Sequence, residues 1–191
     1  MNESVCTKHE TPCIREAVVE DVAQLTAIHN YYVKNAAATF DIEPWTEERR
    51  RTEWFVQFTD NGPHRLLVAE VEGNVIGTAW SGPWRSRAAY YTSVETSVFC
   101  LPSATGRGLG SVLYGKLFEI LEAEPIHRAF AMIVLPNDVS ERLHQRVGFK
   151  RIGVLSEAGR KFDSFWDIAV WERSLESQFR PTATRQNTKR N

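Results

Sequence analysis

The chain has 191 residues and a net charge of −1, with 42% hydrophobic and 25% charged residues. This length suits one α/β domain with a sizeable core, and the composition is that of an ordinary soluble globular protein. The near-neutral charge excludes a broad basic surface for nucleic acid. Residues 1–13 contain no apolar signal segment, and no apolar run approaches the ~20 residues that span a bilayer. We therefore expect a cytoplasmic protein without membrane contact.

The cysteines Cys6, Cys13 and Cys100 show no CxxC or Cys/His ligand spacing. This predicts reduced thiols and no metal site, although zinc held by Cys6, His9 and Cys13 is a weaker alternative. Composition also predicts one domain at 13–176 between two disordered tails, 1–12 and the basic 177–191.

Hydrophobic periodicity divides the first half into a strand, two helices and a hairpin. Asp21 is a candidate cap for the first helix, whose apolar residues recur with a period near 3.6. Trp54, Phe55 and Phe58 give the second helix an apolar side. The predicted elements are a strand at 14–18, helices at 22–33 and 46–58, and strands at 66–71 and 75–81 around the turn 72–74.

The second half predicts a β-α-β-α-β-β order. Residues 127–136 form a continuous apolar run, which is typical of a strand buried on both faces. Gly148 is expected to close the helix before it. The predicted elements are a strand at 89–101, a helix ending before Pro125, a strand at 127–136, a helix at 138–147, and strands at 150–155 and 165–171 around a loop at 156–163.

Three glycines, Gly106, Gly108 and Gly110, lie between the strand ending at Leu101 and the next helix. Glycine admits positive φ and close approach, and the free N–H groups of a helix start form an anion site. No Lys follows Gly110, as a P-loop requires, and GRGLGS is not the dinucleotide pattern GxGxxG. The pattern is closer to Gln/Arg-x-x-Gly-x-Gly/Ala, the pyrophosphate loop of GNAT N-acetyltransferases, while a plain loop-to-helix turn remains the alternative.

Three further segments, SGPWRSRAAYYTSVETSVF, VLPNDVSERLHQRVGF and GRKFDSFWDIAVW, resemble the phosphinothricin and methionine sulfoximine/sulfone N-acetyltransferases of the GNAT superfamily. The resemblance runs from about Ile14 to Leu175. It implies one α/β GNAT domain with a mixed central sheet, splayed where acetyl-CoA enters and flanked by helices. It also implies a homodimer. Thr105 departs from the family pattern, since Gln or Arg usually begins the loop, and this predicts a weaker grip on pyrophosphate.

The resemblance also implies which residues hold the cofactor. Backbone groups near the end of the strand would contact the pantetheine arm, and the glycine loop would bind the pyrophosphate. The implied cofactor-binding residues are Val98, Phe99, Cys100, Gly106, Arg107, Gly108, Leu109, Gly110, Ser111, Asn137 and Ser140. Cys100 is expected to be a packed strand thiol and not an acyl-enzyme nucleophile, because no His or Asp lies near it in sequence.

Glu95 is the candidate general base for the acceptor amine, and His144 is a candidate second proton-relay group. The alternatives are a solvated strand carboxylate for Glu95 and a polar helix-surface histidine for His144. The acceptor would bind Arg85, Ser86, Arg87, Glu95, Thr96 and Ser97, with guanidinium groups suited to its acidic groups. Two ordinary surface arginines remain the alternative for Arg85 and Arg87. Phe40 is a further candidate to cover the acceptor.

These residues predict acetyl transfer from acetyl-CoA to the α-amine of a small amino-acid-like acceptor, in a ternary complex without an acyl-enzyme. One alternative is another acceptor, such as a polyamine, an aminoglycoside or a protein N-terminus. The other is a CoA-binding module without turnover, which the presence of Glu95 and both arginines disfavours.

Overall fold

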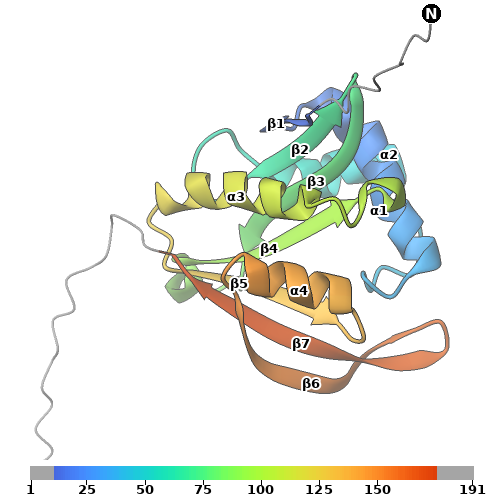
Figure 1. Ribbon diagram of the computed structural model, residues 1–191, viewed down its shortest axis with the longest axis vertical. Coiled ribbons are helices and arrows are strands. Elements are labelled where there is room, and N and C mark those ends of the chain that lie inside the picture. The colour runs from blue at the N-terminus through green and yellow to red at the C-terminus, as the bar shows by residue number, and fades with distance from the viewer. Residues whose placement is uncertain (1–10, 176–191) are drawn as a thin grey trace, which may run out of the picture.

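The computed structural model describes residues 11–175 (Figure 1). The predicted tails lie outside this range except for residues 11 and 12, as do Cys6 and His9 of the alternative zinc site. Within residues 11–175, no group of three or more His, Cys, Asp or Glu residues is placed to hold a metal ion. No helix in that range is long and apolar enough to cross a membrane.

Seven strands form one mixed sheet in the order β1-β2-β3-β4-β5-β7-β6. The central pair, β4 (Ser93–Cys100) and β5 (Arg128–Val134), is parallel, whereas the other neighbours are antiparallel. The parallel register runs only from Ser93↔Arg128 to Glu95↔Phe130. Beyond Glu95 the two strands separate, so the prediction of a mixed, splayed sheet is confirmed.

The first half contains the predicted strand, helices and hairpin. Asp21 precedes α1, but its carboxylate accepts hydrogen bonds from the Val18 N–H (2.8 Å) and from Arg15 instead of capping the helix. The Thr46 hydroxyl accepts from the Arg49 N–H and caps the second helical segment. The elements are β1 (Cys13–Glu16), α1 (Val22–Asn35), α2 (Glu47–Arg49) continued by a π-helical turn (Arg50–Trp54) and a 3-10 turn (Phe55–Gln57), β2 (Leu66–Val71) and β3 (Asn74–Pro83).

The second half differs from the sequence prediction in two places. The strand predicted from Ala89 begins only at Ser93, because Ala88–Tyr90 form a 3-10 turn. The predicted loop at 156–163 is wrong for most of its length, since residues 156–161 extend β6 and Gly159–Lys161 pair with β7, whereas Phe162 and Asp163 form the turn. Gly148, with φ of 89°, follows the last helix as predicted. The remaining elements are α3 (Leu109–Glu122), α4 (Asp138–Arg146), β6 (Lys150–Lys161) and β7 (Ser164–Ser174).

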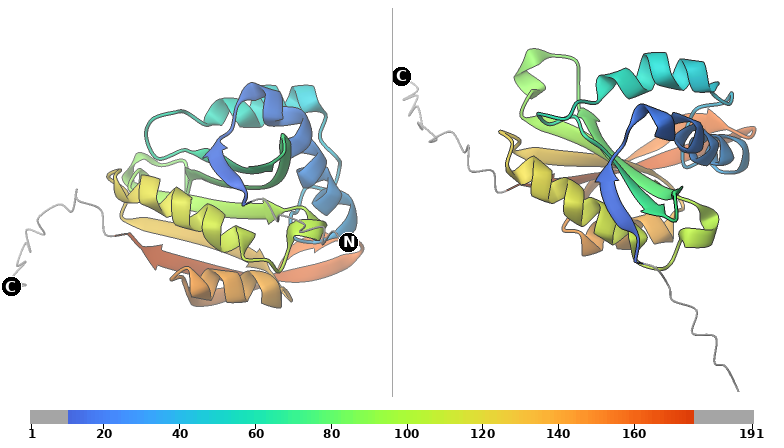
Figure 2. Two further views of the ribbon diagram at one scale, coloured as in Figure 1. Left: turned by 45° about the horizontal axis from the view of Figure 1, so that its top comes forward. Right: turned by 90° about the horizontal axis from the view of Figure 1, so that it is seen from above.

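Helices cover both faces of the sheet (Figure 2). Strand β2 contributes to the core on both faces, because successive side chains of a strand point to opposite faces of the sheet. Leu67 and Ala69 join the large cluster under α3, while Leu66 and Val68 pack with Leu25 of α1. The inner strands of the sheet are therefore buried on both sides, and β4 and β5 separate between two packed layers.

Candidate active site

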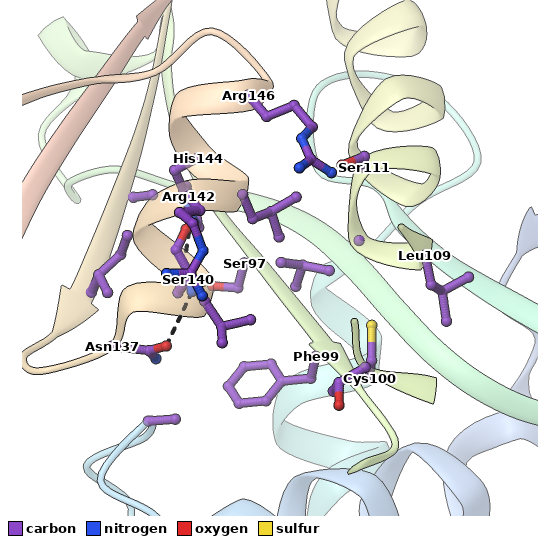
Figure 3. A pocket seen from close by; sticks show the side chains of 18 of the residues that line it. Ser97, Phe99, Cys100, Leu109, Ser111, Asn137, Ser140, Arg142, His144 and Arg146 are labelled. Atoms are coloured by element: carbon purple, nitrogen blue, oxygen red, sulfur yellow. Dashed lines mark hydrogen bonds between the residues drawn. The ribbon is translucent and has the colours of Figure 1, made fainter. Parts of the chain in front are cut away.

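A cavity of about 600 Å³ lies where β4 and β5 separate. The part of β4 beyond Glu95 forms one wall and the end of β5 another, with the starts of α3 and α4 around them (Figure 3). On the side facing β5, this part of β4 has no strand partner. Its backbone groups can therefore bind a ligand, which is what an extended amide-containing arm such as pantetheine requires.

The structure requires glycine at the three loop positions for different reasons. Gly106 and Gly108 have φ of 76° and 82°, and a Cβ on either would meet no protein atom within 4 Å. Positive φ, not crowding, requires glycine there. A Cβ on Gly110 would instead lie 2.8 Å from Cδ2 of Leu143, so this glycine lets α3 approach α4. All three line the cavity at the start of α3.

The cavity can hold anionic groups at this helix start. Gly108 is the N-cap of α3 and supplies no side-chain cap, so the first N–H groups of the helix are available to a ligand. Ser111 Oγ is buried and has no hydrogen-bond partner among the described residues. These observations fit the phosphates of acetyl-CoA, which would supply the missing partners.

Arg142 and Arg146 were missed by the sequence analysis. Both line the cavity and are four residues apart on α4, so they share the helix face that also carries Leu143. Figure 3 shows Arg146 directed from α4 toward Ser111 at the start of α3. Arg107, which was predicted, is exposed and is not among the residues that line the cavity. The Thr105 hydroxyl donates to the Pro102 carbonyl (2.7 Å).

The residues expected to hold the pantetheine arm lie together. Val98, Phe99 and Cys100 line the cavity, and Phe99 stacks on Trp80 with ring centroids 5.5 Å apart. The Cys100 carbonyl accepts a hydrogen bond from the Tyr32 hydroxyl (2.6 Å). Burial raises the pKa of the Cys100 thiol to about 11, which leaves it protonated at neutral pH. This agrees with a packed thiol and argues against an acyl-enzyme nucleophile.

Asn137 and Ser140 also line the cavity, but both have partners within α4. The Asn137 side chain caps this helix, because its Oδ1 accepts from the Ser140 N–H (3.1 Å). Ser140 Oγ lies 3.3 Å from Nδ1 of His144. Figure 3 places these three residues along the cavity edge formed by α4.

Strand alternation places Glu95 and Ser97 on one face of β4 and Thr96 on the other. Thr96 is buried on the α3 side, where its hydroxyl donates to the Phe130 carbonyl (3.3 Å). Glu95 is directly opposite Gly82 of β3, and a Cβ on Gly82 would meet no atom within 4 Å. Open space therefore lies beside the Glu95 carboxylate, on the face that Ser97 shares.

Burial raises the pKa of Glu95, and the positive charge of Arg85 opposes this effect. A carboxylate whose pKa is raised is a better proton acceptor than an exposed one. Arg85 lies over the Trp84 ring (3.9 Å to the centroid), and its Nη1 donates to the Trp84 carbonyl (3.0 Å). Arg85, Ser86 and Arg87 are all exposed, and neither they nor Glu95 are among the residues that line the cavity.

His144 is not a surface histidine, so that alternative is wrong. Only 4% of it is exposed. Its Nδ1 lies 2.8 Å from the Ser140 carbonyl oxygen, so Nδ1 carries the hydrogen and donates it. Nε2 then accepts from the hydroxyl of Tyr114 (3.0 Å), a fully buried residue that the sequence analysis missed. Burial lowers the pKa of His144 and raises that of Tyr114, which keeps both neutral.

Comparison with known proteins agrees with this architecture. Residues 25–149 match the Acetyltransferase (GNAT) family, to which this chain therefore belongs. It is an N-acetyltransferase, and the family predicted from its motifs is confirmed. The chain is 48% identical to the phosphinothricin N-acetyltransferase of Streptomyces coelicolor over 164 residues, which cover 85% of this chain and 95% of that protein.

Other similar proteins have related names. An L-methionine sulfoximine/L-methionine sulfone acetyltransferase of Pseudomonas aeruginosa is 32% identical over 163 residues, covering 85% of this chain and 94% of that protein. A crystal structure of a phosphinothricin acetyltransferase from Sinorhizobium meliloti in complex with acetyl-CoA is similar, with a TM-score of 0.83 and 30% identity. The similarity covers 92% of this chain and 95% of that one.

Proposed function

We propose that this enzyme transfers the acetyl group of acetyl-CoA to the α-amine of a small amino-acid-like acceptor, such as phosphinothricin or methionine sulfoximine. The relatives named for these acceptors support the class of substrate. The observation that carries the proposal is the position of Glu95 at the last β4–β5 register pair, immediately before the cavity begins. A base there lies next to the point where a cofactor and an acceptor would meet.

The cofactor would lie along the separated part of β4, with its phosphates at the start of α3. Gly106, Gly108 and Ser111 would receive the pyrophosphate, and Arg142 and Arg146 would neutralise its charge. Acetyl-CoA supplies an activated acyl group. The protein contributes its position, because holding two reactants in line removes much of the entropic barrier between them.

Glu95 would take the proton that the acceptor ammonium must lose before it can attack. A free α-amine has a pKa of about 8, so most of it is protonated at neutral pH. The raised pKa of Glu95 favours this transfer, and the open space beside Gly82 leaves room for the amine or a bridging water. Because the Cys100 thiol stays protonated, direct attack in a ternary complex is favoured over an acyl-enzyme.

Arg85 is the better candidate of the two loop arginines for an acidic group of the acceptor. Its positive charge opposes the rise in the pKa of Glu95, which supports an interaction with a molecule whose amine is at that carboxylate. Guanidinium suits both a carboxylate and a phosphinate. We assign Ser86, Arg87, Thr96 and Ser97 to the same acceptor region, Thr96 through its backbone because its side chain is buried on the other face.

We further propose that the protein works as a cytoplasmic homodimer. Strand β6 is an edge of the sheet, and the β6–β7 hairpin exposes large apolar side chains. An exposed apolar edge usually marks an interface between chains. These side chains are Ile152, Val154, Leu155, Phe162 and Phe165, each 43% to 64% exposed.

A thiol-release screen with acetyl-CoA tests the function. We expect phosphinothricin and methionine sulfoximine to release CoA faster than a polyamine or an aminoglycoside does. Mass spectrometry of the product should find acetyl on the α-nitrogen. Faster turnover of a polyamine would overturn the acceptor class, and CoA binding without turnover of any amine would overturn the enzymatic role.

A further inference from the structure

Residues Gly159–Phe162 belong to one of the sequence segments that resemble the N-acetyltransferase family, but the proposed reaction does not use them. Lys161 is the last residue of β6 and is only 5% exposed. Nζ donates to the carbonyls of Thr39 (2.7 Å), Ala36 (2.9 Å) and Tyr32 (3.5 Å). An ammonium has three donors, so all of them are used on the backbone.

These carbonyls belong to the end of α1 and to the loop that follows it. The carbonyl end of a helix carries partial negative charge, which a cation stabilises. Burial lowers the pKa of Lys161, with only Asp41 acting in the opposite direction. The buried ammonium is therefore stabilised chiefly by carbonyls, and their positions depend on it in turn.

Gly159 provides a second contact from the same hairpin to the same loop. A Cβ on Gly159 would collide with Cε2 and Cζ of Phe40. The aromatic ring thus lies directly against bare backbone of β6, which no other residue type would allow. Figures 1 and 2 show the hairpin tip beside the end of α1, where these contacts form.

Helix α1 holds the other side of this loop. His29 Nε2 and Asp41 Oδ2 are 2.8 Å apart. Asn30 pairs with both backbone groups of Trp45, donating to its carbonyl (2.8 Å) and accepting from its N–H (2.9 Å). Ala38 lies between Ala36 and Thr39, whose carbonyls bind Lys161. It lines the cavity together with Ser97 and Phe99. The loop therefore contributes Ala38 to the wall of the cavity, and it is fixed from α1 and from β6.

We infer that Lys161 and Gly159 are positioning residues that hold residues 36–41 as the wall against which the acceptor amine is aligned. The inference rests on the proposed function for its kinetic consequence, but not for the contacts themselves. Neither residue touches the reacting atoms. Their effect would pass through Ala38 and Phe40.

Hydrogen exchange measured by mass spectrometry tests the contacts without any substrate. In Lys161→Met, we expect amides of residues 36–41 to exchange at least ~10-fold faster, because the loop loses two hydrogen bonds and the end of α1 loses one. Exchange in α3 should not change. Lys150→Met, at the exposed opposite end of β6, is the matched control and should leave the loop unchanged. Unchanged exchange of the loop in a folded Lys161→Met protein would overturn the inference.

Kinetics then test the role in alignment. Lys161→Met and Gly159→Ala should each raise the acceptor KM at least ~10-fold, while the Kd for acetyl-CoA stays within about twofold. Adding Phe40→Leu to Gly159→Ala removes the colliding ring atoms and should recover part of the lost kcat/KM. Equal loss of acetyl-CoA affinity, or no recovery in the double variant, would show a merely structural role. If the parent enzyme acetylates no amine, the proposed function fails, whereas the exchange result still decides the contacts.

Discussion

The hydroxyl of Tyr114 lies 3.0 Å from Nε2 of His144, and both side chains are buried. Since Nδ1 of the imidazole donates to the Ser140 carbonyl at 2.8 Å, Nε2 must be the acceptor. The pair therefore fixes one neutral tautomer of the histidine beside the cavity.

Tyr114→Phe should raise the pKa of His144. The tyrosine hydroxyl stabilises the neutral imidazole by donating to it, and a phenyl ring cannot. An NMR titration of the His144 ring protons would measure this change. Tyr31→Phe, which alters an exposed tyrosine on α1, is the control and should leave the titration unchanged. A pKa of His144 that is unchanged or lower in Tyr114→Phe would contradict the tautomer assignment.

His144 should also make the free energy of unfolding depend on pH. Burial lowers its pKa in the folded state from the ordinary 6.5, so the unfolded chain binds an extra proton as pH falls below about 6.5. Stability therefore rises with pH up to that value and is lost below it, by at most about 1.4 kcal/mol per pH unit for one proton. Urea unfolding of the parent and of His144→Gln between pH 5 and 8 should show a smaller slope in the variant. Parallel curves would mean that the pKa of His144 is the same in the folded and unfolded states.

The fold was largely predictable because its helices and inner strands have regular apolar periods. The exception at 156–163 shows the limit of that signal. Gly159, Arg160 and Lys161 look like a polar loop, yet they form strand because Ser164–Trp166 pair with them. Strand β6 is an edge strand whose side chains are largely exposed, so its sequence needs no apolar pattern. Pairing with a distant partner, and not local propensity, decides such a segment.

The motifs of the site could be predicted from the sequence, but the side chains that surround the predicted residues could not. Glu95 and Thr96 are neighbours in sequence, and only the pleat of β4 shows that they face opposite layers. Tyr114 occupies an apolar position of α3 and could not be distinguished from core before α4 was placed beside it. Arg142 and Arg146 carried one usable signal, their spacing of four residues on a helix that begins next to the cavity.

Glu95→Gln tests the proposed base. The amide keeps the shape of the side chain but cannot take a proton at neutral pH, so kcat should fall by ~10²–10⁴ while acetyl-CoA affinity barely changes. The residual rate should rise with pH, since more of the acceptor amine is then already neutral. Steady-state kinetics from pH 6 to 9 would measure both effects. Near-normal kcat at pH 7 would show that Glu95 only shapes the acceptor region.

The loop glycines should separate into two classes when they are substituted. Gly108→Val places a branched side chain at positive φ, where the pyrophosphate would approach, and should weaken acetyl-CoA binding at least ~10-fold, or about 1.4 kcal/mol. Gly110→Val instead collides with Leu143 and should lower the melting temperature more than Gly108→Val does. Calorimetric titration and thermal unfolding compare the two. Unchanged affinity in folded Gly108→Val would refute the assignment of the loop to pyrophosphate.

Arg146→Gln tests whether α4 supplies a cofactor contact that Thr105 cannot make, because threonine carries neither the charge nor the length to reach a phosphate. One charge-assisted hydrogen bond is worth about 1.5–3 kcal/mol, so acetyl-CoA affinity should fall at least ~10-fold. The loss should shrink as salt rises, because Arg146 is exposed.

Truncated cofactors locate the contact. If Arg146 binds the pyrophosphate, Arg146→Gln should weaken the binding of acetyl-dephospho-CoA as much as that of acetyl-CoA, and it should not weaken the binding of acetyl-pantetheine. Arg151→Gln removes the same charge from β6, where Arg151 pairs with Glu141 (3.2 Å), and should have no effect on binding. Adding Thr105→Gln to Arg146→Gln should restore part of the affinity. A loss confined to acetyl-CoA would place Arg146 on the 3′-phosphate instead, and no loss at all would leave the pyrophosphate to the backbone of the glycine loop.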